Sequence, residues 1–295
     1  MLVGRPNHIL YSISPKKWVG PCPTSPYPSA VLTPTIKTNY HLLYSHGYGE
    51  YFCPSYDGIA ETLVHEGFLV FGHDHIGHGR STGQRVQVKG MDDYVLPLLS
   101  HAKKVHNDYN KEVPLSIIGH SMGGLITVLS SMAEPDLFKS IVVMGPLIKM
   151  DPNIATPLKK TLASVFSGIL PSFSLGTLDA SAITRDEEVV KRVEQDPLGW
   201  HGGFRTQHSN VLLKATDALA KDQCLKKITA PILIIQGGKD KLVCPDGAPF
   251  LHDNVGSVEK KLLTYDDAYH NLFVELEDVK TAVIKETCTW IEQHL

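Results

Sequence analysis

The sequence predicts an α/β protein whose central sheet is mostly parallel and flanked by helices. Short apolar runs typical of buried strands occupy residues 40–45, 68–72, 115–118, 139–145, 231–237 and 260–265. Segments with helical spacing of apolar residues separate most of these runs, and this alternation favours parallel strands joined by crossover helices. Residues 150–216 interrupt the alternation. We therefore expect an α/β core of residues 39–149 and 217–295, a cap of residues 150–216, and a divergent, proline-rich N-terminal segment of residues 1–38.

The composition is that of an ordinary folded domain. Hydrophobic residues make up 42% and charged residues 20% of the 295 residues, which excludes a disordered or fibrous chain. The net charge of −3 gives no electrostatic basis for binding nucleic acid. Five scattered cysteines without CxxC spacing fit free thiols in a reducing compartment better than a disulfide framework. Neither a bilayer-spanning apolar run nor a signal peptide is visible.

One serine stands at a turn that suits a nucleophile. The apolar run at 115–118 leads into Gly119-His120-Ser121-Met122-Gly123, and a helix-like segment follows as far as residue 133. A serine at such a junction takes a strained backbone conformation with positive φ, and its neighbours two residues away on each side must be almost without side chain. Gly119 and Gly123 meet this requirement. The turn would expose the Ser121 hydroxyl and aim the Met122 N–H at the same point, where it could hold an oxyanion.

Two later residues supply the partners that a nucleophilic serine needs. Asp240 follows the strand at 231–237, at the end of the sheet where ligands bind, and His270 follows the last strand in a polar loop. A bare GxSxG also occurs by chance, but the order Ser, Asp, His is that of a Ser-His-Asp hydrolase. His270 would remove the serine proton during attack, and Asp240 would orient the ring and stabilise the imidazolium. No metal or organic cofactor is needed.

A glycine-rich loop follows the strand at 40–45. The sequence His46-Gly47-Tyr48-Gly49-Glu50 can turn backbone N–H groups toward a ligand. The Tyr48 N–H is therefore the second candidate oxyanion donor. A plain turn is the alternative for this segment.

The loop at residues 73–81 suggests a different enzyme class. His73, His75 and His78 form an HxHxxH pattern that resembles the zinc signature of metallo-β-lactamase-like hydrolases. That signature has an aspartate before its last histidine, whereas this sequence has Gly77. The alternative is structural, with Asp74 capping the loop and glycines allowing its turns.

The cap contains one amphipathic segment. Between residues 154 and 170 apolar side chains share one helical face, and Lys159 and Lys160 lie opposite. Such a helix can be buried against the core, or its apolar face can line an acyl channel or touch a membrane surface. The sequence leaves both interpretations open.

Several strings carry a family resemblance. They are HGYGE, VFGHDHIGHGRSTGQR, GHSMGG, LPSFSLG, QDPL and AYHNLFVE. From residue 40 onward the chain resembles the monoacylglycerol lipases of the α/β-hydrolase superfamily. The resemblance implies an eight-stranded sheet, a helical cap inserted after the sixth strand, and cleavage of monoacylglycerol to fatty acid and glycerol. It makes Ser121 the nucleophile, Asp240 the acid and His270 the base, with Tyr48 and Met122 as oxyanion donors.

The same resemblance implies partners and a location. The substrate is a monoacylglycerol or a similar single-chain lipid ester, and the protein is cytosolic with peripheral membrane contact through its cap. An esterase or lysophospholipase that acts on other single-chain lipid esters is the nearest alternative.

The sequence departs from the family pattern at four places. Tyr48 stands where the oxyanion loop usually has a small residue, and its side chain is expected to narrow the mouth of the site. No counterpart of a family arginine at the glycerol end follows Glu50, and Val193 replaces a cap tyrosine. The leader before residue 40 lacks the usual paired opening strands, and we expect only a short edge strand at 8–14. These differences concern the head-group preference more than the reaction.

Overall fold

A computed structural model of the chain describes residues 18–19, 29–32, 40–52, 59–150, 156, 161, 164, 166–221 and 223–294. Within them an eight-stranded sheet has the order β1-β2-β4-β3-β5-β6-β9-β10. Its strands are β1 (Trp18–Val19), β2 (Ser29–Leu32), β3 (Tyr40–Ser45), β4 (Phe68–His73), β5 (Leu115–His120), β6 (Ser140–Met144), β9 (Ile232–Gly237) and β10 (Lys260–Tyr265). From β4 to β10 every neighbouring pair is parallel, which confirms the predicted mostly parallel sheet.

The central strands coincide with the predicted apolar runs because they are buried on both faces. β4, β5, β6 and β9 have every side chain buried, whereas β10, at the edge, is partly exposed. Parallel pairing brings the carboxyl ends of these strands to one edge of the sheet. The loops that carry Tyr48, Ser121, Asp240 and His270 leave the sheet at that edge.

The opening edge of the sheet corrects one expectation. β1 and β2 pair antiparallel with each other, and β2 pairs antiparallel with β4. The statement that the paired opening strands are missing was therefore wrong. The prolines in this part of the sequence are tolerated only near the edge of a sheet, and β1 is the edge strand, with β2 between it and β4. The edge strand expected at 8–14 lies outside the described residues.

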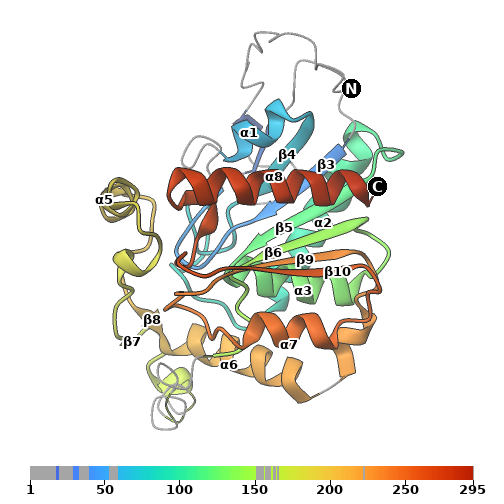
Figure 1. Cartoon of the computed structure of the whole chain (residues 1–295). Coiled ribbons are helices and arrows are strands. Elements are labelled where there is room, and N and C mark those ends of the chain that lie inside the picture. Colours follow the sequence, from blue (N-terminus) through green and yellow to red (C-terminus); the bar gives the residue numbers. More distant parts are fainter. Residues whose placement is uncertain are drawn as a thin grey trace.

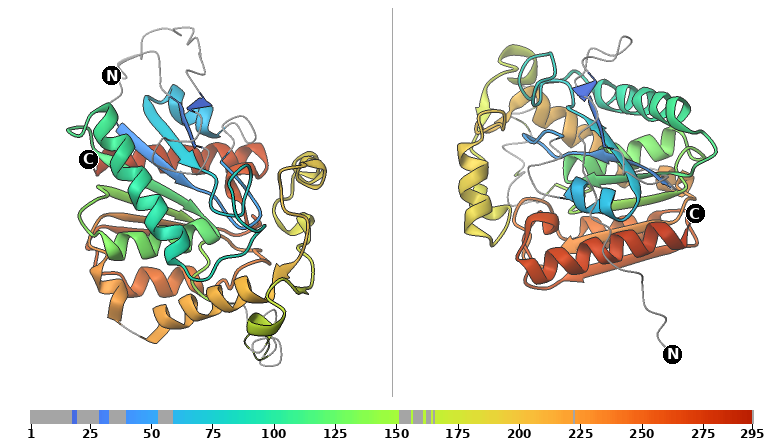
Figure 2. Two further views of the ribbon diagram at one scale, coloured as in Figure 1. Left: turned by 180° about the vertical axis from the view of Figure 1, so that it is seen from behind. Right: turned by 90° about the horizontal axis from the view of Figure 1, so that it is seen from above.

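Helices cover both faces of the sheet (Figures 1 and 2). α1 (Ile59–His65) and α8 (Glu277–Gln293) lie on one face and share an apolar cluster with it. α2 (Asp92–Tyr109), α3 (Met122–Ala133) and α7 (Gly247–Asn254) lie on the other face, where a larger cluster forms. Because one apolar cluster covers each face of the sheet, the inner strands are apolar along their whole length.

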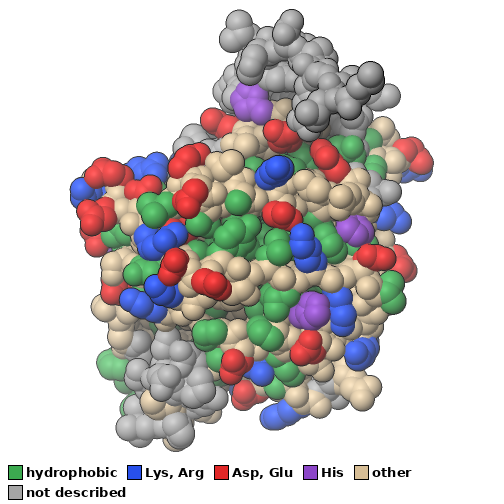
Figure 3. Space-filling model, viewed as in Figure 1, with side chains coloured by type: hydrophobic (Ala, Val, Ile, Leu, Met, Phe, Trp, Pro, Cys, Tyr) green, Lys and Arg blue, Asp and Glu red, His purple; other side chains and the backbone are tan. Residues whose placement is uncertain are grey.

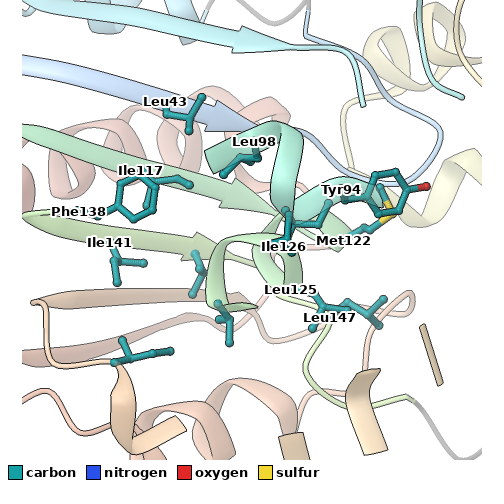
Figure 4. Close-up of a cluster of buried hydrophobic side chains, with 14 of the residues drawn as sticks. Leu43, Tyr94, Leu98, Ile117, Met122, Leu125, Ile126, Phe138, Ile141 and Leu147 are labelled. Carbon is teal, nitrogen blue, oxygen red and sulfur yellow. The ribbon is translucent and has the colours of Figure 1, made fainter. Parts of the chain in front are cut away.

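Helix α3 is anchored deep in the larger cluster. Leu125 and Ile126 of α3 point into it together with Ile117 of β5, and Met122 lies next to Tyr94 of α2 (Figure 4). All five side chains are fully or almost fully buried. Each such burial stabilises the fold by about 1.5–3 kcal/mol. The first turn of α3 is therefore held firmly against the sheet.

The described residues of the segment predicted to form the cap, 150–216, follow β6 and lie at one end of the sheet (Figure 1). The segment contains β7 (Ser174–Leu175), α5 (Glu187–Gln195), β8 (Phe204–Arg205) and most of α6 (Thr206–Lys221). β7 and β8 pair antiparallel, which the sequence did not predict. Of the amphipathic helix predicted at 154–170, residues 161, 164 and 166–169 are helical, and most of the others lie outside the described residues.

The charged side chains on the surface are of mixed sign, in agreement with the small net charge. On the face shown in Figure 3, acidic and basic side chains are interspersed. Within the described part of the chain, no helix is both long and apolar enough to cross a membrane. Cys224, Cys244 and Cys288 are free thiols.

Candidate active site

Ser121 occupies the turn between β5 and α3. Its φ of 55° and ψ of −118° lie in a region that residues other than glycine rarely adopt, at a cost of about 1–3 kcal/mol. Its N–H donates to the Met144 carbonyl at 3.0 Å, and its own carbonyl accepts from the N–H groups of Gly124 and Leu147. The strained turn that the sequence predicts is confirmed, and hydrogen bonds to the neighbouring strand and helix hold it in place.

Gly119 and Gly123 flank the turn because no side chain fits there. A Cβ atom on Gly123 would collide with the Ser45 carbonyl of β3, and one on Gly119 would collide with the Gly123 carbonyl. The backbones of helix α3 and of the sheet therefore pack against each other with no side chain between them, as predicted.

Replacing Gly123 by alanine is expected to destabilise the protein by about 3 kcal/mol or more, because a clash with backbone cannot be relieved by a side-chain rotation. Thermal unfolding followed by circular dichroism measures this loss. The matched control is Gly90→Ala, since a Cβ atom at Gly90 meets nothing within 4 Å. Equal melting temperatures for the two variants would contradict the expectation.

Asp240 and His270 form a buried pair beyond the ends of β9 and β10. His270 Nδ1 donates to Asp240 Oδ2 at 2.7 Å, and both side chains are almost fully buried. The N–H groups of Leu242 and Val243 donate to Asp240 Oδ1, and Gln236 Nε2 donates to Oδ2 at 3.0 Å. Because Nδ1 carries the proton in the bond to Asp240, Nε2 is the nitrogen left to exchange a proton.

The two members of this pair shift each other's pKa. Burial opposes the charged form of His270, but the Asp240 carboxylate and its hydrogen bond, with a smaller contribution from Glu50, raise the pKa of His270 above its usual value. Burial opposes the charged form of Asp240 as well, but His270 and two backbone N–H groups lower the pKa of Asp240. An ionised carboxylate thus lies beside an imidazole that binds a proton readily, as a general base requires.

The loop after β3 is held by a buried histidine. His46 Nδ1 donates to the Gly47 carbonyl at 2.9 Å, and His46 Nε2 accepts from the His75 N–H at 2.9 Å. The Gly47 carbonyl and the Tyr48 N–H belong to one peptide, and in a trans peptide these two groups point in opposite directions. His46 therefore restrains the direction of the Tyr48 N–H.

Glu50 is a residue of the site that the sequence pattern did not reveal. Its Oε2 accepts from the Gly47 N–H at 2.8 Å and lies 3.0 Å from His120 Nδ1. Glu50 thereby joins the loop after β3 to the last residue of β5, and His120 packs on His270 with ring centroids 4.8 Å apart. Burial would raise the pKa of Glu50, but His120 and the Gly47 N–H lower it. Only its position in the glycine-rich loop could have drawn attention to this residue.

A cavity of about 820 Å³ connects these elements, a volume within the usual range for ligand sites. Ser121, His270, Tyr48 and Met122 line it, and Asp240 contacts it through His270. Apolar side chains from both the core and the cap complete much of the wall: Tyr44, Phe52, Leu63, Val70, Leu147, Phe204, Leu212 and Leu213. Neither the Tyr48 nor the Met122 N–H donates to another described residue, so both are available to an oxyanion.

The histidines at the end of β4 and in the loop after it contact other protein groups. His73 Nδ1 lies 3.1 Å from His101 Nδ1, and His75 Nε2 lies 3.2 Å from Ser45 Oγ. Asp74 accepts the Arg80 N–H of the loop, as the structural alternative predicts, and also the Phe52 N–H of the segment after β3. Among the residues that the structure describes, no three His, Cys, Asp or Glu side chains are placed to hold a metal ion. The geometry of these residues does not support the zinc alternative.

Known proteins match the chain over most of its length. Residues 37–277 match the family described as serine aminopeptidase, S33. The chain is 37% identical to the monoglyceride lipase of Rattus norvegicus, over 85% of this chain and 82% of that protein. It is 36% identical to the monoglyceride lipase of Homo sapiens, over 85% and 81% of the two chains. The chain belongs to the monoglyceride lipase family.

The α/β-hydrolase fold expected of this family is also confirmed. The solved structure of a soluble variant of monoglyceride lipase from Saccharomyces cerevisiae superposes with a TM-score of 0.82, at 20% identity over 99% of both chains. Of the predicted site residues, the structure joins Asp240 to His270 by a hydrogen bond and places Ser121, Tyr48 and Met122 on the cavity wall beside His270.

Proposed function

We propose that this member of the monoglyceride lipase family is a serine hydrolase that cleaves monoacylglycerol to a free fatty acid and glycerol through an acyl-enzyme. The cavity is the observation that carries the proposal. Ser121 and His270 share its wall with apolar side chains of the core and the cap. A single acyl chain can therefore lie along the apolar wall while its ester group reaches the serine. Relatives of the chain named monoglyceride lipase support the same substrate.

The proposed reaction uses three side chains and two backbone N–H groups. Ser121 Oγ attacks the ester carbonyl while His270 Nε2 takes its proton, and Asp240 stabilises the imidazolium through the 2.7 Å bond to Nδ1. The N–H groups of Tyr48 and Met122 hold the tetrahedral oxyanion. His270 then protonates the departing glycerol oxygen, which leaves the acyl group on Ser121. A water molecule repeats the sequence and releases the fatty acid, so no metal or organic cofactor is required.

Replacing Ser121 by alanine is expected to lower the rate of fatty-acid release from a monoacylglycerol by at least about 10⁴-fold, because the acyl-enzyme cannot form. Ser130→Ala is the matched control, since Ser130 is a buried serine of α3, the helix that follows Ser121, and does not line the cavity. Labelling with a fluorophosphonate and peptide mapping should place the adduct on Ser121. Comparable rates for the wild type and Ser121→Ala would refute the proposal.

Hydrolysis of other single-chain lipid esters is the second candidate function. Val193, an apolar residue, lines the cavity where the family resemblance places a tyrosine. The valine side chain offers no hydrogen bond to a polar head group at this position. Relative kcat/KM values for a monoacylglycerol, a lysophospholipid and a simple alkyl ester of the same acyl chain distinguish the two candidates.

We also propose that the cap makes peripheral contact with a membrane. Ile169, Leu170 and Phe173 expose 71%, 50% and 54% of their surface, and neighbouring exposed apolar side chains mark interaction sites. We call these three residues the apolar patch. Residues 176–178, a few positions later, line the cavity. A bilayer that covers the patch would therefore lie close to the path by which a lipid reaches Ser121.

The double variant Ile169→Ser, Phe173→Ser is expected to bind phosphatidylcholine vesicles at least about tenfold more weakly, because it removes two apolar side chains from the contact. Cosedimentation measures this affinity. Val258→Ser is the matched control, since Val258 is 91% exposed but lies outside the cap, just before β10. Unchanged vesicle binding by the double variant would contradict the proposed contact.

We also propose that the chain divides into an α/β core and a cap, and that the protein resides in the cytosol. The antiparallel pairing of β7 with β8 inside the cap supports treating it as a unit. Helix α6 continues to Lys221, across the proposed boundary at residue 216.

A further inference from the structure

Three contacts tie the loop that carries Tyr48 to the cap. We call residues 46–51 the oxyanion loop. The contacts are Tyr48 Oη to the Gly203 carbonyl at 3.1 Å, the Trp200 N–H to the Gly49 carbonyl at 2.9 Å, and Tyr51 Oη to Asp196 Oδ2 at 2.8 Å. All three partners lie in one short cap segment, residues 196–203. The oxyanion loop and this segment are therefore docked as one unit.

Tyr48 makes the most extensive of these contacts. Its ring stacks on Phe204 of β8 with centroids 4.7 Å apart and planes 26° apart, and it lies 4.9 Å from the ring of His208 of α6. Aromatic pairs of this kind contribute about 0.5–1.5 kcal/mol beyond the burial of their area. Burial also raises the pKa of the Tyr48 hydroxyl, so Oη stays protonated and remains a donor. The side chain does not simply narrow the mouth of the site, because much of it is packed into the junction of core and cap.

The cap side of this contact is itself firmly placed. The Gly203 carbonyl also accepts from Trp200 Nε1 at 3.1 Å. The Arg205 guanidinium lies over the Trp200 ring at 4.9 Å. The backbone at Gly203 packs so closely on the Gly176 carbonyl that a Cβ atom could not be accommodated. Tyr48 Oη is thus bound to a fixed acceptor.

We propose that the side chain of Tyr48 is a positioning residue, which holds the oxyanion loop against the cap and so fixes the direction of its own backbone N–H. His46 restrains the same peptide from the other end, through the Gly47 carbonyl. A hydrogen bond to an oxyanion weakens steeply when the donor turns away from the line to its acceptor, so small rotations of this peptide slow the reaction. The inference rests on the proposed function, because it requires the Tyr48 N–H to hold an oxyanion.

One consequence concerns the cap. Docking of the cap and completion of the oxyanion site become the same event, since the segment that covers the cavity also orients one of the two donors. A cap that moves away from the oxyanion loop leaves the nucleophile in place but the oxyanion site incomplete.

The test compares Tyr48→Phe with a matched tyrosine variant on 4-nitrophenyl butyrate. Tyr48→Phe keeps the ring stack but loses the bond to Gly203, and we expect kcat to fall about tenfold with KM changed less than about twofold. The Ki of an alkyl trifluoromethyl ketone, which forms a tetrahedral oxyanion on serine, should rise by the same factor as kcat/KM falls. Tyr94→Phe is the control, because Tyr94 Oη lies 3.0 Å from His208 Nε2 and so bonds the core to α6 rather than to the segment at residues 196–203. Its kcat and Ki should match those of the wild type.

A second variant reaches the same contact from the cap. Phe204→Leu removes the ring stack without altering the oxyanion loop, and it should also lower kcat and raise the Ki of the ketone. Melting temperatures above the assay temperature establish that each variant is folded. If Tyr48→Phe and Phe204→Leu both keep the kcat and Ki of the wild type, the inference is overturned while the proposed function stands. The same holds if Tyr94→Phe loses as much kcat as Tyr48→Phe. A wild-type protein that neither hydrolyses the ester nor is labelled at Ser121 would overturn the proposed function, and the inference with it.

Discussion

Replacing Asp240 by asparagine is expected to lower kcat by about four orders of magnitude while leaving the fold intact. The amide group has nearly the same volume as the carboxylate, but its nitrogen can donate to His270 Nδ1. The ring would then carry its proton on Nε2, where it cannot accept the proton of Ser121. The substitution also removes the charge that raises the pKa of His270 and stabilises the imidazolium during attack.

The pH dependence of kcat/KM tests the same interaction. In the wild type the rate should rise with pH until His270 loses its proton, with a midpoint above the ordinary histidine pKa of 6.5. In Asp240→Asn the midpoint should move down, because burial lowers the pKa of His270 and only the smaller contribution of Glu50 then opposes it. Asp267→Asn is the control, since Asp267 is an exposed carboxylate of the loop after β10 that pairs with Lys239. A kcat for Asp240→Asn within about tenfold of the wild type would exclude Asp240 from the mechanism.

Acidification below about pH 6 is expected to unfold the protein steeply, because several histidines are buried in the neutral form. Burial is the main cause in each case. It lowers the pKa of His73, His75 and His78 well below the usual value. It lowers the pKa of His101 to about 4 and that of His208 to about 3.

The direction of the effect follows from proton binding. In the unfolded chain these histidines take up a proton near their ordinary pKa of 6.5, whereas in the folded protein they do so only at much lower pH. As the pH falls below about 6.5, each therefore lowers the free energy of unfolding by about 1.4 kcal/mol per pH unit. Five such groups would exhaust a typical stability of roughly 5–15 kcal/mol within about two pH units. Above about pH 7 these groups leave the stability unchanged.

Urea unfolding followed by tryptophan fluorescence between about pH 8 and about pH 4.5 measures this slope. His208→Gln removes one buried titrating group and should flatten the slope by about 1.4 kcal/mol per pH unit. His65→Gln, at an exposed position at the end of α1, should leave the slope unchanged. A free energy of unfolding that stays constant between about pH 6.5 and about pH 5 would show that the buried rings ionise within the fold.

The nucleophile turn could be predicted because its requirements are local. Ser121 and its two flanking glycines lie within five residues, and the patterns on either side identify a strand and a helix. Asp240 and His270 could be placed beside it because each follows a buried strand, and parallel strands end at the same edge of the sheet. The hydrogen bond between them then depends on loops that only the structure describes.

The features that were missed depend on contacts between distant parts of the chain. Glu50 meets His120 across 70 residues, and Tyr48 meets Gly203 across 155 residues. Neither segment contains a pattern that indicates its partner. The opening strands were missed for another reason. β1 has two residues and β2 has four, which is too short for a periodic pattern to appear among the prolines.

The backbone at position 121 has a consequence for engineering this protein. Glycine adopts a φ of 55° without the penalty that a Cβ atom brings, so glycine at this position would relieve roughly 1–3 kcal/mol while removing the hydroxyl. A variant library selected only for heat tolerance would therefore drift away from serine here. A sequence optimised in that way would gain thermal stability and lose its nucleophile through one substitution.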